Sequence, residues 1–75
     1  MNYIILCDSS KEAYDLFIET VRKLSPIKAN MKTKKVLFSG DIYSFESRSF
    51  FNRYLKKNFL GETRTKEYFF EKWLS

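Results

Sequence analysis

The sequence predicts a small α/β (or α+β) domain, in which a sheet of three to four strands packs against three helices in the order β-α-β-β-(β)-α-α. An uninterrupted apolar run near the start is typical of a strand covered on both faces. Apolar residues recur at helical spacing in three later segments. Between the first two of these segments, polar and apolar residues alternate as in strands. Residues 1–75 are expected to form a single domain.

The first strand and the first helix have the clearest signals. Asn2 to Cys7 contains the apolar run Tyr-Ile-Ile-Leu-Cys. Ser9 and Glu12 have the spacing of a capping box, in which each side chain satisfies a free backbone N–H of the other. Pro26 ends the helix, because the residue before a proline avoids the α region. The buried stripe of this helix is predicted to be Ala13, Leu16, Phe17, Val21 and Leu24.

The next segments predict strands. Residues 27–32 alternate between apolar and polar side chains and predict a brief strand. Residues 35–39 and 42–46 predict a hairpin, with its turn at Gly40-Asp41. In the second of these strands, Tyr43 and Phe45 alternate with polar side chains.

A second helix is expected to run to about Asn58, with Ser47 or Ser49 as its N-cap. Gly61 lies where a left-handed C-terminal cap is expected. The apolar set of this helix is Phe50, Phe51, Tyr54, Leu55 and Phe59. Burial in the core is expected for most of these rings, whereas the hydroxyls of Tyr43 and Tyr54 tolerate exposure.

The last helix begins after Thr63 or Thr65 and has an aromatic side. Its apolar residues are Tyr68, Phe69, Phe70, Trp73 and Leu74. Two interpretations remain open. The rings dock on the sheet, or they form an exposed patch that contacts a partner or builds a homodimer through this C-terminal aromatic helix.

The charge distribution suggests a binding surface. The chain has 14 basic and 9 acidic residues, a net charge of +5, and a basic stretch without acids from Arg22 to Lys35. In the second helix, Arg53, Lys56 and Lys57 are expected to share one face. These charges either form a solvated face or bind an acidic protein or a phosphate backbone. The predicted partner-binding residues are Lys28, Lys32, Lys34, Lys35, Arg53, Lys56, Lys57 and Trp73.

Candidate chemical groups are few. The chain has no histidine, which removes the commonest general base and metal ligand. Cys7 precedes a helix start, where a thiol can be activated, but it is interpreted as a structural thiol because no base accompanies it. The following polar residues, Asp8 to Ser10, either bind an anion or cap the helix, and capping is favoured. Asp41 and Glu46 lie five residues apart on a strand and so point to opposite faces. No catalytic, cofactor or metal site is therefore predicted.

The segment from Tyr3 to Phe45 resembles part of the RecA-type ATPase core of helicases and phage terminases. The run Tyr3-Ile-Ile-Leu-Cys-Asp leads through Ser9-Ser10-Lys11-Glu12-Ala13 into a helix, and Val36-Leu-Phe-Ser-Gly-Asp-Ile-Tyr-Ser-Phe45 follows as a hairpin. The phosphate loop and the acidic metal motif of that core are missing, so the resemblance implies no ATPase activity. The Lys-, Asn-, Phe- and Ile-rich composition is also similar to that of small accessory proteins of phages and mobile elements.

These observations favour a non-enzymatic binding protein that modulates or inhibits a larger protein with an acidic or apolar surface. The alternative is a nucleic-acid-binding protein that uses phosphate contacts on its basic surface. A cytoplasmic location, within a host cell if a phage encodes the chain, is expected from the single cysteine and the lack of a signal-peptide pattern. No apolar run is long enough to cross a membrane, so no membrane partner is expected.

Overall fold

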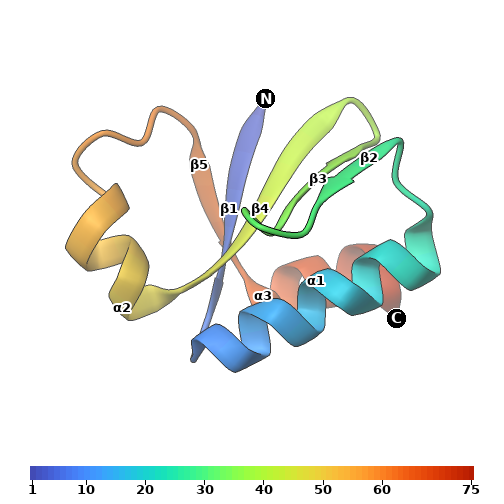
Figure 1. Cartoon of the computed structure of the whole chain (residues 1–75), viewed down its shortest axis with the longest axis horizontal. Coiled ribbons are helices and arrows are strands. Elements are labelled where there is room, and N and C mark those ends of the chain that lie inside the picture. The colour runs from blue at the N-terminus through green and yellow to red at the C-terminus, as the bar shows by residue number, and fades with distance from the viewer.

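The computed structural model describes residues 1–75 and shows one five-stranded sheet with helices on both faces (Figure 1). Two short helices continue directly into π-helical turns, labelled η1 and η2. The elements are β1 (Asn2–Cys7), α1 (Ser10–Leu24), β2 (Lys28–Asn30), β3 (Lys35–Phe38), β4 (Asp41–Ser47), α2 (Arg48–Phe50), η1 (Phe51–Leu55), β5 (Glu62–Thr65), α3 (Lys66–Phe69) and η2 (Phe70–Leu74). The predicted mixed class and the three helices are confirmed, whereas the predicted three to four strands are too few.

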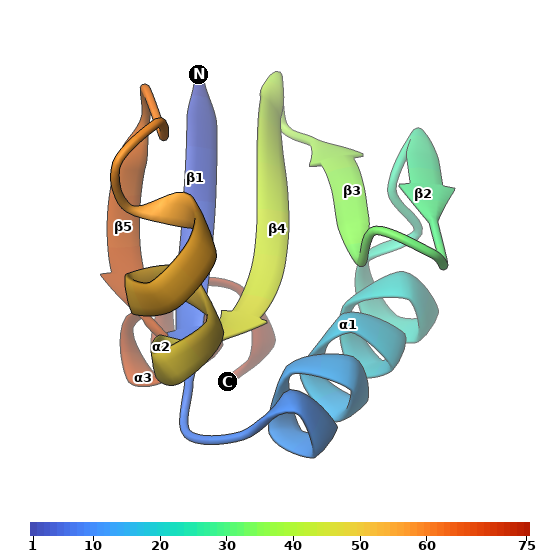
Figure 2. The ribbon, with the colours of Figure 1, turned by 60° about the vertical axis from the view of Figure 1, so that its left-hand side comes forward.

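The sheet has the strand order β2-β3-β4-β1-β5. β1 is parallel to both of its neighbours, β4 and β5, and β3 is antiparallel to β4. The chain thus crosses from β1 to β4 in one direction and from β4 back to β5 in the other. Because parallel crossovers are almost always right-handed, connections that run in opposite directions lie on opposite faces. Figure 2 shows this result, with α2 on one face of the sheet and α1 and α3 on the other.

The strand that the sequence did not predict is β5, whose residues are Glu-Thr-Arg-Thr. It contains no apolar residue, and therefore no alternating pattern. It pairs in register with β1, for example Thr63 with Ile4, and β-branched threonine suits a strand. The predicted cap at Thr65 is confirmed, because its hydroxyl accepts a hydrogen bond of 3.1 Å from the backbone N–H of Tyr68.

Helix α1 agrees with its local signals. The Ser9 hydroxyl accepts a hydrogen bond of 3.1 Å from the Glu12 N–H, which is half of the predicted capping box. The other half is replaced, because the Glu12 carboxylate binds the ammonium group of Lys66. Ser25, in the left-handed conformation with φ of 47°, ends the helix before Pro26.

Three other predictions are wrong in detail. The second helix ends at Leu55 rather than near Asn58. Gly61 does not adopt the left-handed conformation, and its lack of a side chain serves close packing instead, since a Cβ atom there would lie 2.3 Å from the Asn2 carbonyl oxygen. The hairpin turn is centred on Ser39 and Gly40, with φ values of 55° and 82°, rather than on Gly40-Asp41. Positive φ at both residues is typical of the type I′ turn that matches strand twist.

The core lies between the sheet and the α1–α3 layer. Phe17, Phe45 and Phe69 are fully buried there. The Phe69 ring meets the rings of Tyr43 and Phe45 edge to face, with centroids 5.2 and 5.3 Å apart. Tyr43 is therefore buried, although the sequence suggested that it tolerates exposure.

The docking of α3 through Phe69 gives the first testable prediction. Phe69→Ala should lower the free energy of unfolding by about 3–5 kcal/mol, because it deletes a fully buried ring from a small core. The matched control is Phe70→Ala on the adjacent residue, which is 44% exposed and should cost little. Urea unfolding followed by circular dichroism measures both changes, and equal losses in the two variants would show that α3 does not dock through Phe69.

Candidate binding groove

The two faces of β4 carry different chemistry. Tyr43 and Phe45 point into the core, whereas Ser44 and Glu46 point to the face where α2 lies. Ile4 shares that second face, since it pairs with Ser44 in register. From α2 and η1, only Phe51 is buried. Part of this face of the sheet therefore remains open.

The open part forms a groove of about 570 Å³ between the turn that joins β2 to β3 and the segment α2–η1. We call it the basic groove. Its charged and aromatic lining residues are Lys32, Lys34, Lys35, Glu46, Phe50, Tyr54 and Phe59.

The β2–β3 turn is held rigidly at one side of the groove. The Asn30 side-chain oxygen accepts hydrogen bonds from the N–H groups of Lys32 and Thr33, at 2.9 and 3.1 Å. Lys34 adopts a left-handed conformation with φ of 54°, and its carbonyl oxygen accepts a bond of 3.1 Å from the Phe45 N–H. Hydrogen bonds thus hold Lys32 and Lys34 in the turn, and Lys35 follows them as the first residue of β3.

Glu46 is the one acidic side chain in the basic groove. Its carboxylate lies 3.8 Å from the Lys34 ammonium nitrogen, and its side chain is only 16% exposed. Burial raises the pKa of Glu46, and the nearby charges of Lys34 and Lys35 partly oppose this effect. The groove therefore becomes more positive when Glu46 is protonated.

Two exposed rings line the other side of the groove. Phe50 and Tyr54 are 41% and 61% exposed, and their ring centroids are 5.1 Å apart. The Arg53 guanidinium lies 6.0 Å from the centre of the Tyr54 ring. A smaller hollow that contains Arg53, Ser10 and Ser49 continues the groove toward the start of α1. Rings and cations thus alternate along one continuous surface.

The structure divides the predicted partner-binding residues into separate groups. Lys32, Lys34 and Lys35 line the basic groove, Arg53 extends it, and Lys28 lies beside Lys35 on the sheet. Lys56 and Lys57 lie in the turn just after the helix end at Leu55, where Lys56 keeps helical dihedral angles, and neither of them lines the groove.

Trp73 belongs to the opposite face of the molecule. It packs edge to face on Phe38, with ring centroids 4.8 Å apart, and is partly buried against the core. Of the four rings at the end of the chain, Tyr68 and Phe70 are exposed, whereas Phe69 is buried and Trp73 is partly buried. The sequence named Phe50 and Tyr54 but expected them on the apolar side of a helix, and only the placement of α2 shows that they are exposed.

The carboxyl ends of β1 and β5 hold the other candidate chemical groups. Cys7 is fully buried, and burial raises the pKa of its thiol to about 11. Lys66 donates a hydrogen bond of 2.9 Å to Asp8, and this bond lowers the pKa of the carboxyl group. The Ser9 hydroxyl is engaged in capping. Nowhere do three His, Cys, Asp or Glu side chains form a group that could hold a metal ion.

Comparison of the chain with protein-family models, with curated proteins and with solved structures gave no match. None of the helices combines the length and the hydropathy that a membrane-spanning helix requires.

The raised pKa of Glu46 predicts a pH-dependent effect on stability. A carboxyl group whose pKa is higher in the folded state stabilises the fold at low pH, and this contribution is lost as the pH rises through the folded pKa. Glu46→Gln should therefore raise the melting temperature relative to the wild type at neutral pH, and the difference should shrink below pH 4.5, the ordinary carboxyl value. Thermal unfolding from pH 3 to pH 8 tests this expectation.

Glu71→Gln is the control for the Glu46 prediction, because it removes the same charge from an exposed side chain outside the groove. The melting temperature of Glu71→Gln should not show the pH-dependent increase over the wild type that burial of the carboxylate predicts for Glu46→Gln. A lower melting temperature for Glu46→Gln at neutral pH would show that the attraction of Lys34 outweighs the cost of burying the carboxylate.

Proposed function

We propose that the chain is a small non-enzymatic binding protein whose basic groove binds single-stranded nucleic acid. The observation that carries this proposal is the exposed pair of rings, Phe50 and Tyr54, beside the three lysines Lys32, Lys34 and Lys35 of the β2–β3 turn and the start of β3. Proteins that bind single strands combine a positive groove for the backbone with aromatic rings on which bases stack. A duplex offers no free base faces, so exposed rings favour a single strand.

The charges suit a phosphate backbone. Lys32 and Lys35 are exposed, and neither forms an ion pair within the protein. The Lys34 ammonium nitrogen lies 3.8 Å from the Glu46 carboxylate, and Lys34 becomes more available to a phosphate when Glu46 is protonated. Arg53 extends the positive surface beyond the rings. Phosphates on both sides of a stacked base would thus meet a cation.

The chemistry of the site supports binding rather than catalysis. The Cys7 thiol, with its pKa raised to about 11, is buried away from the groove. The one carboxylate in the groove faces a lysine. A cytoplasmic location remains part of the proposal and is supported by the single, buried cysteine.

The second candidate function is modulation or inhibition of a larger protein, whose acidic surface would bind the basic groove. The resemblance to phage accessory proteins suggests this function. A specific observation favours it. Met31, next to Lys32 in the β2–β3 turn, is 58% exposed, and Leu60, after η1, is 95% exposed. Aliphatic side chains beside a basic groove suit a protein surface better than a nucleotide.

Fluorescence anisotropy with a labelled 15-residue oligothymidine tests the proposed function. We expect affinity to fall with salt, with a log–log slope of about −0.7 per phosphate neutralised. The double variant Phe50→Ala/Tyr54→Ala should weaken binding roughly tenfold or more, because each base–ring stack contributes about 1–3 kcal/mol.

The matched control is Tyr14→Ala/Phe70→Ala, which removes two rings, each 44% exposed, that lie outside the groove. It should leave the affinity unchanged. Absence of binding even at low salt, or equal weakening in both double variants, would contradict the proposal and favour the protein partner.

A further inference from the structure

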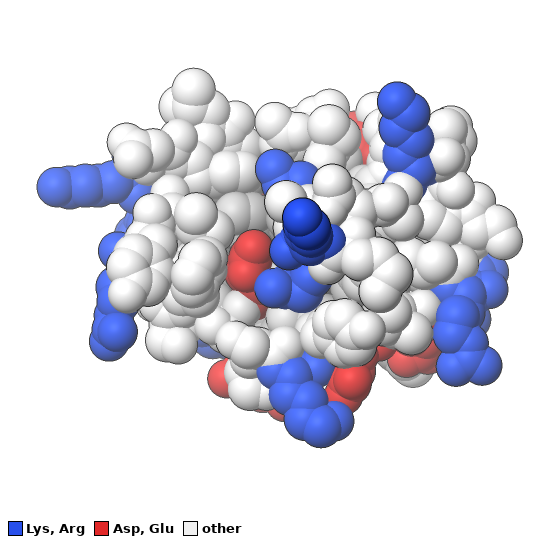
Figure 3. All heavy atoms as spheres, in the orientation of Figure 1, with Lys and Arg blue, Asp and Glu red and all other residues white.

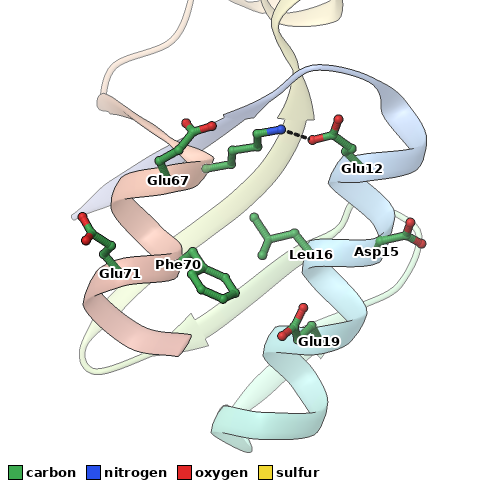
Figure 4. A pocket seen from close by; sticks show the side chains of 8 residues that line it. Glu12, Asp15, Leu16, Glu19, Glu67, Phe70 and Glu71 are labelled. Carbon is green, nitrogen blue, oxygen red and sulfur yellow. Dashed lines mark hydrogen bonds and ion pairs between the residues drawn. The ribbon is translucent and has the colours of Figure 1, made fainter. Parts of the chain in front are cut away.

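The opposite side of the molecule carries a second groove, which lies between α1 and the segment α3–η2. Its accessible lining is mostly apolar. Figure 4 shows Leu16 of α1 and Phe70 of η2 pointing toward one another across it. Phe70 is 44% exposed, although the adjacent Phe69 is fully buried. We call this surface the acidic groove because carboxylates surround its apolar floor.

Carboxylates line both sides of this apolar floor. Five of the nine acidic residues of the chain gather here, which are Glu12, Asp15 and Glu19 on α1, with Glu67 and Glu71 on the facing segment. In the space-filling view, most of the visible carboxylates lie along the lower edge, where α1 runs (Figure 3). A protein with a net charge of +5 thus concentrates negative charge around one exposed ring.

Internal ion pairs neutralise only the α1 side of this rim, where Lys66 also lines the groove. Lys11 binds Asp15 and Lys23 binds Glu19, at 2.8 and 2.9 Å, and Lys66 binds Glu12. Glu67 and Glu71 have no basic partner in the structure. These two carboxylates are therefore free to pair with charges from another molecule, although Glu71 points outward from η2, away from Leu16 and Phe70 (Figure 4).

From these observations we propose that the acidic groove binds a basic segment of a partner protein, which inserts an apolar side chain between Leu16 and Phe70. Charge decides the occupant. A symmetric contact with a second copy would place carboxylates against carboxylates, and like charges in an interface are unfavourable. Nucleic acid is repelled for the same reason. Lysine or arginine on both flanks of an apolar residue matches the rim and the floor together.

The groove has the length for a short segment. Glu12 and Glu19 are seven residues apart on α1, which corresponds to about 10 Å along the helix axis. A partner helix of about two turns spans the same distance. This site goes beyond the proposed function, since it takes a different ligand on the opposite face.

The experiment uses the intact chain and a labelled 14-residue peptide of lysine and leucine, with the leucines at helical spacing. Binding is measured by fluorescence anisotropy, with a peptide that has glutamate in place of lysine as the negative probe. Phe70→Ala and the double variant Glu67→Gln/Glu71→Gln should each weaken binding of the lysine peptide roughly tenfold. The double variant Asp41→Asn/Glu62→Gln, which changes the net charge equally outside the groove, should bind as the wild type does.

Two results would overturn this proposal. One is unchanged affinity in Phe70→Ala, or equal weakening in both charge variants. The other is self-association in analytical ultracentrifugation that Phe70→Ala abolishes, which would assign the groove to a second copy. Phe50→Ala/Tyr54→Ala should leave peptide binding intact, so the two proposed sites can fail independently.

Discussion

The position of β1 between two parallel neighbours determines on which face of the sheet α1 and α2 lie. A parallel pair needs a crossover connection, and β1 has two parallel partners on opposite sides. The chain therefore travels first to β4 and then back across β1 to β5, and right-handed connections in these two directions use opposite faces. The apolar run from Tyr3 to Cys7 makes this arrangement stable, because a strand in this position is covered on both sides.

This constraint gives the molecule two unlike sides. Helices α1 and α3 share one face, where Phe17 and Phe69 fill the core and the two helices leave a groove between them. Segment α2–η1 lies alone on the other face and contributes little to the core, so Ser44 and Glu46 of β4 border an open groove. The charges follow the same division. Carboxylates gather around the groove between the helices, whereas lysines line the groove on the sheet. A small chain can thus offer separate surfaces to partners of opposite charge.

Local signals in the sequence predicted the elements well, because they act over three or four residues. Ser9, Ser47 and Thr65 each cap the helix that follows them. Features that depend on contacts between residues far apart in the sequence could not be predicted. Strand β5 has no pattern of its own and exists because β1 pairs with it. The basic stretch was predicted as a candidate binding surface, whereas burial in the core was favoured for the rings of the second helix, because their exposure depends on the face that α2 occupies. The convergence of the acids of α1 with Glu67 and Glu71 depends on the docking of α3.

The central claim is that nucleic acid binds only the sheet side of the molecule. It is tested most directly by titrating the isotopically labelled chain with oligothymidine and following backbone amide signals by nuclear magnetic resonance. We expect shifts to concentrate in the β2–β3 turn, at Ser44 to Glu46, along α2–η1 and at Ser10 at the start of α1, while the residues around the acidic groove stay unchanged. Shifts centred on the acidic groove, or spread evenly over both faces, would contradict this claim.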